Sequence, residues 1–185
     1  MPTTECFYYE LRSMQPESLS ANERAARFLY LNRFCFNGVY RTNRAGIFNV
    51  PRGVRVGALP TLEDIAAFGR LLRRAELEAG DFEAVLARCG VNDFVYLDPP
   101  YAGRGVRNRG EYGVNSFSED DVARLHDTLE NASSRGAKIL ISYGDVPIVR
   151  QAFRKWQIRE LTVGRNVSGF LHGRREVQEL LITNY

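Results

Sequence analysis

The stretch Phe94–Tyr101, which reads Phe-Val-Tyr-Leu-Asp-Pro-Pro-Tyr, constrains the fold of this chain more than any other. Its first residues form an apolar run without polar alternation, which is typical of a parallel strand buried on both faces. Pro99 and Pro100 have no N–H to donate, so ladder pairing must stop at Asp98. In open α/β sheets, ligands bind beyond the carboxyl ends of the strands. The sequence therefore predicts an α/β fold in which Asp98 brings a carboxylate to a binding crevice.

The chemistry of this turn suits a planar base with an exocyclic amine. The prolines stiffen the backbone, the Asp98 carboxylate and the turn carbonyls accept hydrogen bonds, and Tyr101 offers a flat ring beside them. The alternative interpretation is a plain surface turn, because the Asp-Pro-Pro-Tyr string is short. Its position directly after a predicted buried strand favours a site.

Composition indicates a soluble globular chain with one domain and room for a small insert. Of its 185 residues, 44% are hydrophobic and 25% are charged. No apolar run approaches the ~20 residues of a membrane helix, and no signal pattern opens the chain. We therefore expect a cytoplasmic protein without a membrane partner. Cys6, Cys35 and Cys89 are scattered and accompanied by only 2 histidines, so we expect reduced thiols and no metal.

Positive charge is distributed unevenly, although the net charge is only +3. The stretch from Arg33 to Leu62 contains several arginines and no acidic residue, and a second basic cluster lies between Arg150 and Arg175. Arginine reads guanine edges, asparagine can read adenine, and aromatic rings can wedge into a base stack. The loop between Asn37 and Gly53 combines all of these residue types, which suits DNA reading. The alternative to a DNA-reading loop is an irregular polar loop. The arginine content could also reflect genomic base composition.

Capping signals and apolar runs predict the other elements. Ser20 with Glu23 forms a capping-box signature before an apolar stripe, which predicts a helix over about Ala21–Phe34. We expect further helices capped by Thr61, Asp81, Ser118 and Asp145, strands at 75–78, 94–97, 138–142, 158–163 and 176–183, and a hairpin loop at 165–175.

Two groups of motifs resemble the Dam-type (D12 class) DNA adenine-N6 methyltransferases. The Asp-Pro-Pro-Tyr turn matches the family's catalytic motif, which occurs in related form in RNA and protein methyltransferases. A more specific match runs through Tyr30–Arg33, Asn37–Asn43 and Gly46–Pro51, and it has the spacing of the family's target-recognition region. The resemblance implies a Rossmann-like class I methyltransferase fold with a small, mainly helical recognition insert. Residues 1–20 would then be a leading segment or remnant, 21–74 the recognition region and 75–185 a partial catalytic domain.

The resemblance also assigns residue roles. It implies S-adenosylmethionine as the methyl donor and double-stranded DNA, with a GATC-like target, as the substrate. Arg41 is the implied guanine reader, and Phe36 lies where a ring wedges beside the flipped base. The implied catalytic residues are Asp98, Pro99, Pro100 and Tyr101, and the implied cofactor-binding residues are Asp81, Phe82 and Asp98. The implied DNA-binding residues are Arg33, Phe36, Asn37, Gly38, Val39, Arg41, Asn43, Pro51, Arg52, Asn115 and Ser116. A helix N-cap is an alternative role for Asp81 and is compatible with cofactor contact.

The first two strands of the family's sheet have no counterpart in this sequence. In the implied strand order 3-2-1-4-5-7-6, residues 75–78 would be strand 3 and residues 94–97 strand 4. The Phe-x-Gly-x-Gly cofactor loop belongs to the absent region, so we expect a truncated reading frame, a second polypeptide that supplies the region, or an inactive chain. The bare edge of strand 94–97 would invite a partner. A noncatalytic DNA-binding fragment and an RNA or protein amino-methyltransferase are the alternative functions.

Overall fold

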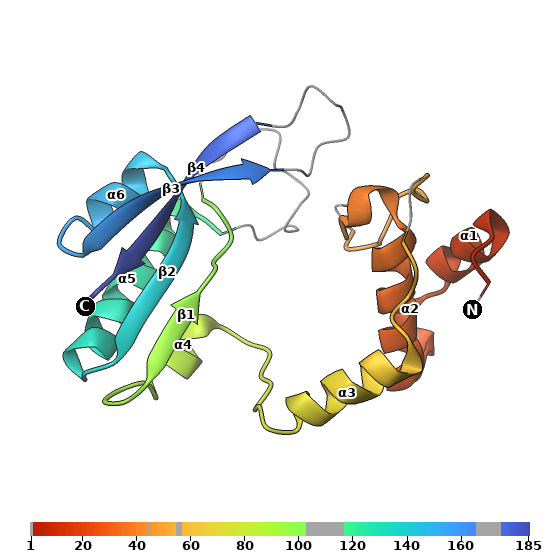
Figure 1. Ribbon diagram of the computed structural model, residues 1–185, viewed down its shortest axis with the longest axis horizontal. Helices are drawn as coiled ribbons and strands as arrows, with labels where there is room; N and C mark the ends of the chain where they lie inside the picture. Colours follow the sequence, from red (N-terminus) through yellow and green to blue (C-terminus); the bar gives the residue numbers. More distant parts are fainter. Residues whose placement is uncertain (1, 44, 55–56, 103–116, 166–174) are drawn as a thin grey trace. The chain divides into compact units, whose positions relative to one another are not determined.

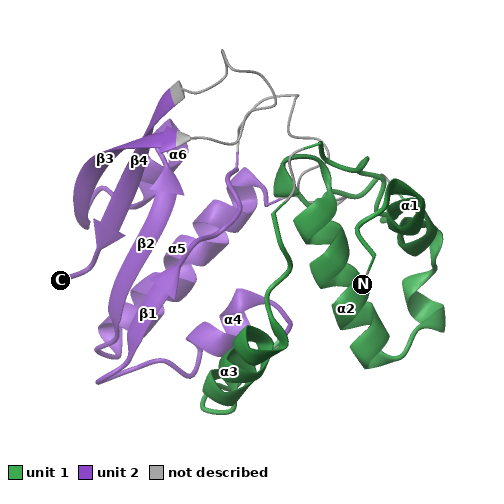
Figure 2. Ribbon diagram, turned by 45° about the vertical axis from the view of Figure 1, so that its right-hand side comes forward, with its two compact units in different colours: residues 1–78 green, residues 79–185 purple. Residues whose placement is uncertain are grey.

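The computed structural model describes residues 2–43, 45–54, 57–102, 117–165 and 175–185. These form two compact units, Met1–Glu78 and Ala79–Tyr185 (Figure 2), which are described separately. The predicted DNA contacts Asn115 and Ser116, and most of the expected hairpin loop at 165–175, lie outside the described residues.

Unit 1 is organised around α2, which begins at the predicted capping box between Ser20 and Glu23. Glu23 accepts the Ser20 N–H at 2.9 Å, and Ser20 accepts the Glu23 N–H at 3.4 Å. The sequence did not predict α1, which precedes α2 along the chain (Figure 1). The elements of this unit are α1 (Glu5–Ser13), η1 (Pro16–Ser18), α2 (Ala21–Phe34), η2 (Phe36–Gly38) and α3 (Leu62–Leu72).

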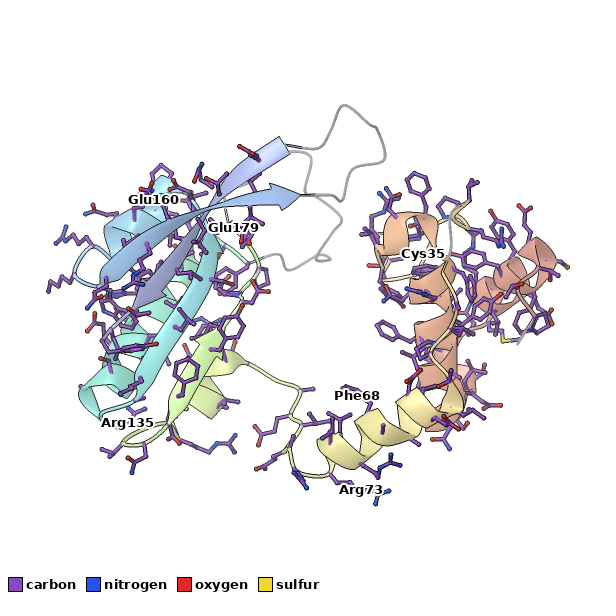
Figure 3. All side chains as sticks on the ribbon, in the orientation of Figure 1. Cys35, Phe68, Arg73, Arg135, Glu160 and Glu179 are labelled. Atoms are coloured by element: carbon purple, nitrogen blue, oxygen red, sulfur yellow. The ribbon has the colours of Figure 1, made fainter. Side chains whose placement is uncertain are left out.

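The core of unit 1 is rich in aromatic side chains, and it ties α1 to α2. The Tyr8 hydroxyl donates to the Val50 carbonyl at 3.0 Å. Arg27, which is 6% exposed, donates from Nε to the Leu11 carbonyl at 2.8 Å and from Nη2 to the Arg12 carbonyl at 3.0 Å. The buried guanidinium therefore satisfies carbonyls that the end of α1 leaves without helical partners. The buried members of this core are Tyr8, Leu11, Tyr30, Leu31, Phe34, Cys35 (Figure 3), Phe48 and Val50.

Helix α3 begins as predicted, because Thr61 and Asp64 form a capping box. None of its side chains is buried, and Phe68 is 61% exposed (Figure 3). The predicted strand at 75–78 is wrong: these residues form no strand, and Leu77 is 72% exposed. The segment alternates alanine or leucine with glutamate, which favours strands poorly, and the described residues offer it no strand to pair with.

Unit 2 contains a sheet in the order β1-β2-β4-β3. Strands β1 and β2 are parallel, and β4 runs antiparallel to both β2 and β3. Helix α5 runs along one face of this sheet (Figure 1). The elements are α4 (Phe82–Leu86), β1 (Phe94–Leu97), α5 (Glu119–Ser134), β2 (Lys138–Gly144), α6 (Pro147–Ala152), β3 (Gln157–Arg165) and β4 (Arg175–Thr183).

The core of unit 2 lies on the helix-covered face of the sheet. Its fully buried members include Leu125 and Leu129 of α5, and Ile139 and Ile141 of β2. On β1, Val95 and Leu97 pack against this core, as side chains on alternate positions of a strand share one face.

The prediction that β1 is buried on both faces is wrong. Phe94 is 59% exposed and Tyr96 58% exposed, although both belong to an unbroken apolar run. The reason is that the described helices of unit 2 cover only the face to which Val95 and Leu97 point. The run of apolar residues therefore predicted the strand correctly but not its surroundings.

The expected cap of α6 by Asp145 is also wrong. Val146 occupies the N-cap position without a side-chain bond, and Pro147 begins the helix. A proline at this position has no N–H that needs a partner, which reduces the need for a cap. The Asp145 carboxylate instead accepts from Arg150 Nε at 2.6 Å and Nη2 at 2.8 Å.

Candidate functional site

The Asp-Pro-Pro-Tyr turn begins where the pairing of β1 with β2 ends. The last paired residues are Leu97 and Ile141, and Asp98 follows with an exposed side chain. Ser142 Oγ donates to Asp98 Oδ1 at 3.2 Å and lies 3.1 Å from the Tyr96 hydroxyl. The carboxylate is thus held at the carboxyl end of a parallel pair of strands, as the sequence predicted, and it faces solvent.

Tyr101 closes the turn with its ring half-buried. Its ring centroid lies 5.1 Å from that of Tyr143 at an interplanar angle of 46°, and its hydroxyl donates to Glu179 Oε1 at 3.3 Å. Ring packing and a hydroxyl partner restrict both side-chain torsions. The aromatic face beside Asp98 is therefore positioned by neighbours from β2 and β4.

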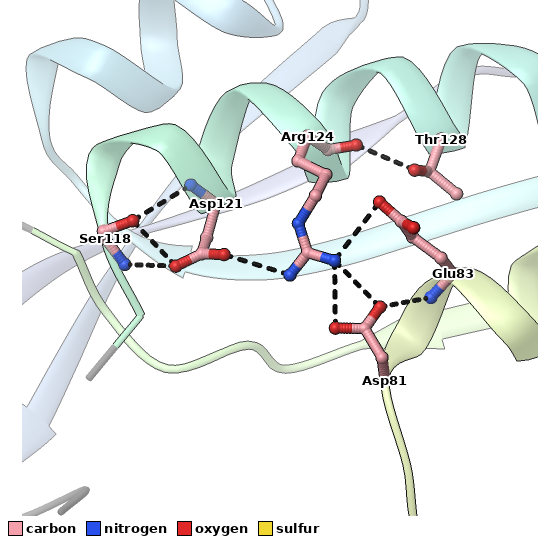
Figure 4. A network of polar contacts seen from close by, with 6 residues as sticks. All are labelled: Asp81, Glu83, Ser118, Asp121, Arg124 and Thr128. Carbon is pink, nitrogen blue, oxygen red and sulfur yellow. Dashed lines mark hydrogen bonds and ion pairs between the residues drawn. The ribbon is translucent and has the colours of Figure 1, made fainter. Parts of the chain in front are cut away.

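A charged network joins α4 to the start of α5 (Figure 4). Asp81 accepts the Glu83 N–H at 3.0 Å, so its predicted role as the N-cap of α4 is confirmed. Arg124 Nη1 also contacts Asp81 Oδ2 at 2.9 Å and Glu83 Oε1 at 3.2 Å, and Arg124 Nη2 contacts Asp121 Oδ1 at 3.0 Å. One guanidinium therefore forms ion pairs with three carboxylates. The sequence did not predict the contact between Arg124 and Asp81, because the two residues lie far apart along the chain.

This network lowers the pKa of its carboxyl groups. The Glu83 N–H and Arg124 lower the pKa of Asp81, and bonds from Ser118 and Arg124 lower the pKa of Asp121 to about 2. A carboxyl whose folded pKa lies below its unfolded pKa stabilises the fold above the unfolded pKa, and this contribution is lost as pH falls through the folded pKa.

We therefore expect the stability of the chain to decrease as the pH falls from about 4 to about 2. Replacing Asp121 by asparagine removes a titrating group and should flatten this dependence, as measured by urea unfolding across the pH range. Asp127→Asn is the matched control, because the Asp127 side chain is 80% exposed on the same helix. Equal pH profiles for wild type and Asp121→Asn would contradict the assignment.

Two aromatic rings lie beside this network. The Arg124 guanidinium stacks over the Phe82 ring at 4.4 Å, and the Phe82 and Phe117 ring centroids are 6.3 Å apart. These groups combine a hydrogen-bond acceptor, the Asp81 carboxylate, with two flat apolar rings, which fits the hydroxyls or amine and the ring of an adenosine group. Sequence reasoning named Asp81 and Phe82 but missed Phe117 as their neighbour.

In unit 1, the loop at 35–53 is closed at its base. The Phe36 N–H donates to the Pro51 carbonyl at 2.9 Å. A Cβ at Gly53 would lie 2.9 Å from the Cys35 carbonyl oxygen, so only glycine allows the two chain segments to approach this closely. The loop therefore leaves the end of α2 and returns beside it.

Two asparagines of this loop shape its backbone. Asn37 has φ 59° and Gly38 has φ 65°, both in the left-handed region that these residue types tolerate best. Asn43 Oδ1 accepts the N–H groups of Ala45 at 2.9 Å and Ile47 at 3.0 Å. Since its oxygen is occupied, Asn43 presents chiefly its amide nitrogen to a ligand, which disfavours the two-bond reading of adenine.

The predicted DNA contacts of this loop differ in their surroundings. Arg41 is exposed. Arg33 Nε donates to the Ala58 carbonyl at 2.7 Å, and Arg52 Nη2 donates to the Thr3 carbonyl at 2.9 Å. Arg52 also has a buried Nε without a hydrogen-bond partner among the described residues. Phe36, Asn37, Gly38, Asn43 and Pro51 are exposed, and Val39 is half-buried.

Within the described ranges, no group of His, Cys, Asp and Glu side chains is arranged to hold a metal ion. Nor does any helix in those ranges have the length and apolar character needed to cross a membrane.

The mixed α/β unit with its four-stranded sheet is consistent with a methyltransferase fold, and comparison with known proteins identifies the family. The profile of the D12 class N6 adenine-specific DNA methyltransferases matches residues 2–167. The chain belongs to this family.

Three relatives, two DNA adenine methylases and a type II methyltransferase, align with nearly all of this chain. A DNA adenine methylase of Vibrio cholerae is 35% identical over 94% of this chain and 64% of its own length. A DNA adenine methylase of Escherichia coli K12 is 32% identical over 98% of this chain and 66% of its own length. A type II methyltransferase of Lactococcus lactis subsp. cremoris is 30% identical over 97% of this chain and 66% of its own length. The chain thus spans about two thirds of the length of these relatives.

Proposed function

We propose that the chain carries the recognition and methyl-transfer residues of an S-adenosylmethionine-dependent DNA adenine-N6 methyltransferase that acts on a GATC-like site. The observation that carries this proposal is the exposed Asp98 carboxylate, held by Ser142 at the end of β1 and followed by the prolines and Tyr101. The family membership supports the reaction, and the names of the relatives support DNA as the substrate.

The residues of the turn have separate roles in this proposal. The target adenine must leave the base stack, which costs a few kcal/mol. Tyr101 stacks on the flipped adenine ring, and this stacking stabilises the flipped state by about 1–3 kcal/mol. Asp98 and the Pro99 carbonyl accept hydrogen bonds from N6, which directs the nitrogen lone pair away from the ring and toward the methyl carbon.

S-adenosylmethionine, when bound, supplies an electrophilic methyl group on a sulfonium. Asp81, Phe82 and Phe117 would hold its adenosine part, as their mixture of carboxylate and rings allows. Asp98 would hold the N6 amine in position to receive that methyl group. The proton that N6 loses then passes to solvent near the exposed carboxylate. Catalysis rests on position and electrostatics rather than on a covalent intermediate.

The sheet supports the inference of a partial Rossmann-like catalytic domain. Its order β1-β2-β4-β3, with β4 antiparallel, corresponds to the 4-5-7-6 part of the implied family order. In the described residues β1 pairs only with β2. A polypeptide that adds strands along the other edge of β1 would complete the sheet and supply the cofactor loop.

The test is isothermal titration of S-adenosylmethionine into the full chain, with and without a GATC duplex, beside Asp98→Ala. Saturable binding with the wild type and its loss in the variant would support the role of Asp98 and would contradict the need for an added polypeptide. A tritium-transfer assay on duplex DNA and on RNA of the same sequence then identifies the substrate. Transfer to RNA alone would overturn the assignment in favour of an RNA amino-methyltransferase.

A noncatalytic DNA-binding chain is the second candidate. The observation that favours it is the engagement of Asp81, which already contacts Arg124 and the Glu83 N–H. A ligand hydroxyl or amine would have to compete with these partners. Duplex binding without any cofactor binding would support this candidate.

Arg41 provides a prediction for the recognition loop. If Arg41 reads a guanine with its two-donor fork, Arg41→Ala should weaken binding to a GATC duplex by about 1–3 kcal/mol and relax specificity at that position. Competitive fluorescence anisotropy with matched and substituted duplexes measures both effects. Arg24→Ala is the control, because Arg24 is exposed in the first turn of α2, at the end away from the loop. An equal loss on all duplexes would identify Arg41 as a phosphate contact instead.

A further inference from the structure

Tyr143 is a buried residue of β2 whose hydroxyl contacts the backbone of the Asp-Pro-Pro-Tyr turn. The side chain is 1% exposed. Its hydroxyl donates to the Pro100 carbonyl at 3.0 Å and accepts the Ala102 N–H at 2.6 Å. A tyrosine hydroxyl has one donor and can also accept, so both functions are used on one short segment.

The turn needs this support because of its composition. Pro99 and Pro100 have no N–H, so these two residues cannot attach the turn to a neighbouring strand by donating backbone bonds. Ala102 is 1% exposed, and a buried N–H without a partner is costly. The Tyr143 hydroxyl satisfies that N–H and at the same time fixes the carbonyl before Tyr101.

Ser142 holds the other end of the same turn. It donates to Asp98 Oδ1 at 3.2 Å, whereas its neighbour Tyr143 contacts Pro100 and Ala102. Successive residues of a strand point to opposite faces of the sheet. Consecutive residues of β2 therefore hold the turn from both faces, just beyond the last pair of the β1–β2 ladder.

We propose that Tyr143 is a positioning residue for methyl transfer, and this inference rests on the function proposed above. Tyr143 does not face the reacting atoms. It acts through the Pro100 carbonyl and the Ala102 N–H, which set the path of the backbone between Asp98 and Tyr101. Loss of the hydroxyl lets this segment move, so that the Asp98 carboxylate and the Pro99 carbonyl no longer meet the target amine together.

This role predicts a specific kinetic pattern for Tyr143→Phe, which keeps the ring in the core and removes only the hydroxyl. A displacement of about 1 Å at a reacting centre can reduce turnover about 100-fold. We expect kcat to fall about 10- to 100-fold, while KM for the duplex changes less than about twofold, because the recognition loop is untouched.

The matched control is Trp156→Phe in the same unit. Trp156 Nε1 donates to Glu130 Oε1 at 2.8 Å, so this variant also removes one hydrogen bond from a ring that packs against the core. Trp156 has no part in the turn or in the predicted recognition loop. If the effect of Tyr143→Phe were only reduced stability, Trp156→Phe would lower kcat as well.

The second readout does not depend on activity. Amide hydrogen exchange of the full chain should show Ala102 protected in the wild type and exchanging about five- to tenfold faster in Tyr143→Phe, with Ile139 and Ile141 unchanged. A fall in kcat with unchanged KM, together with faster Ala102 exchange, supports the inference. Wild-type kcat in Tyr143→Phe overturns it and leaves the proposed function intact.

Failure of the proposed function gives a different result. If the wild-type chain transfers no methyl group to any duplex, the exchange experiment alone decides whether Tyr143 fixes the turn. Faster exchange confined to Ala102 then supports the structural part of the inference, that Tyr143 fixes the turn. Equal exchange in wild type and Tyr143→Phe overturns it.

Discussion

Asp98→Asn should lower the kcat of methyl transfer about 10³-fold, the magnitude seen when one preorganised electrostatic group is removed from an active site. Asparagine keeps the size of the side chain and can still accept from Ser142, which donates to Asp98 Oδ1 at 3.2 Å. It lacks the negative charge that stabilises positive charge developing on N6. Tritium transfer to a GATC duplex under single-turnover conditions measures the chemical step directly.

The control for this result is Asp127→Asn, which removes the charge of an aspartate that is 80% exposed on α5. Its kcat should equal that of the wild type. Binding of the duplex should be retained in both variants, since the predicted DNA contacts in unit 1 are unchanged. An Asp98→Asn variant that transfers methyl at the wild-type rate would rule out the proposed role of the turn.

Leu129→Ala should destabilise the chain by about 2–5 kcal/mol. Leu129 is 0% exposed in the core beneath the sheet, so truncation removes buried apolar surface and leaves a cavity among rigid neighbours. Urea unfolding followed by tryptophan fluorescence suits this measurement, because the only tryptophan, Trp156, packs against the same core.

Asn131→Ala is the comparison variant for Leu129→Ala. Asn131 is exposed on α5 two residues further on, and its side chain leaves no cavity when shortened. Its free energy of unfolding should remain within about 0.5 kcal/mol of the wild type. Similar losses in the two variants would show that helix α5 does not pack on the sheet as described.

Local sequence patterns predicted the parts of the fold that local interactions decide. The capping boxes at Ser20, Thr61 and Ser118 each join a hydroxyl to an acid three residues later, and each begins a helix as expected. The prolines after Asp98 likewise mark the end of β1, because a missing N–H ends a ladder wherever the strand lies.

Features that depend on distant neighbours were not predictable in this way. An apolar run shows that Phe94 and Tyr96 suit a strand, but whether anything covers them is decided by other segments. The same holds for Arg124, which meets Asp81 only after α4 and α5 pack together. In the sequence, nothing distinguishes Tyr143 from the apolar residues of the neighbouring strand. Its hydroxyl reaches the Asp-Pro-Pro-Tyr turn because of the register in which β1 pairs with β2.

The helix α1 was missed for a related reason. Its residues mix aromatic and polar side chains with little periodicity, which favoured an entry segment or remnant over a helix. Its burial depends on α2 and on the loop that follows, since Tyr8 reaches Val50. No pattern within α1 itself carries that information.

The buried guanidinium of Arg27 makes α2 dependent on the segment that precedes it in the chain. A fragment that started at Ser20 would lack the carbonyls of Leu11 and Arg12, and the Arg27 guanidinium would lose both of these partners. A piece of unit 1 that starts before Glu5 should therefore be more stable than one that starts at Ser20.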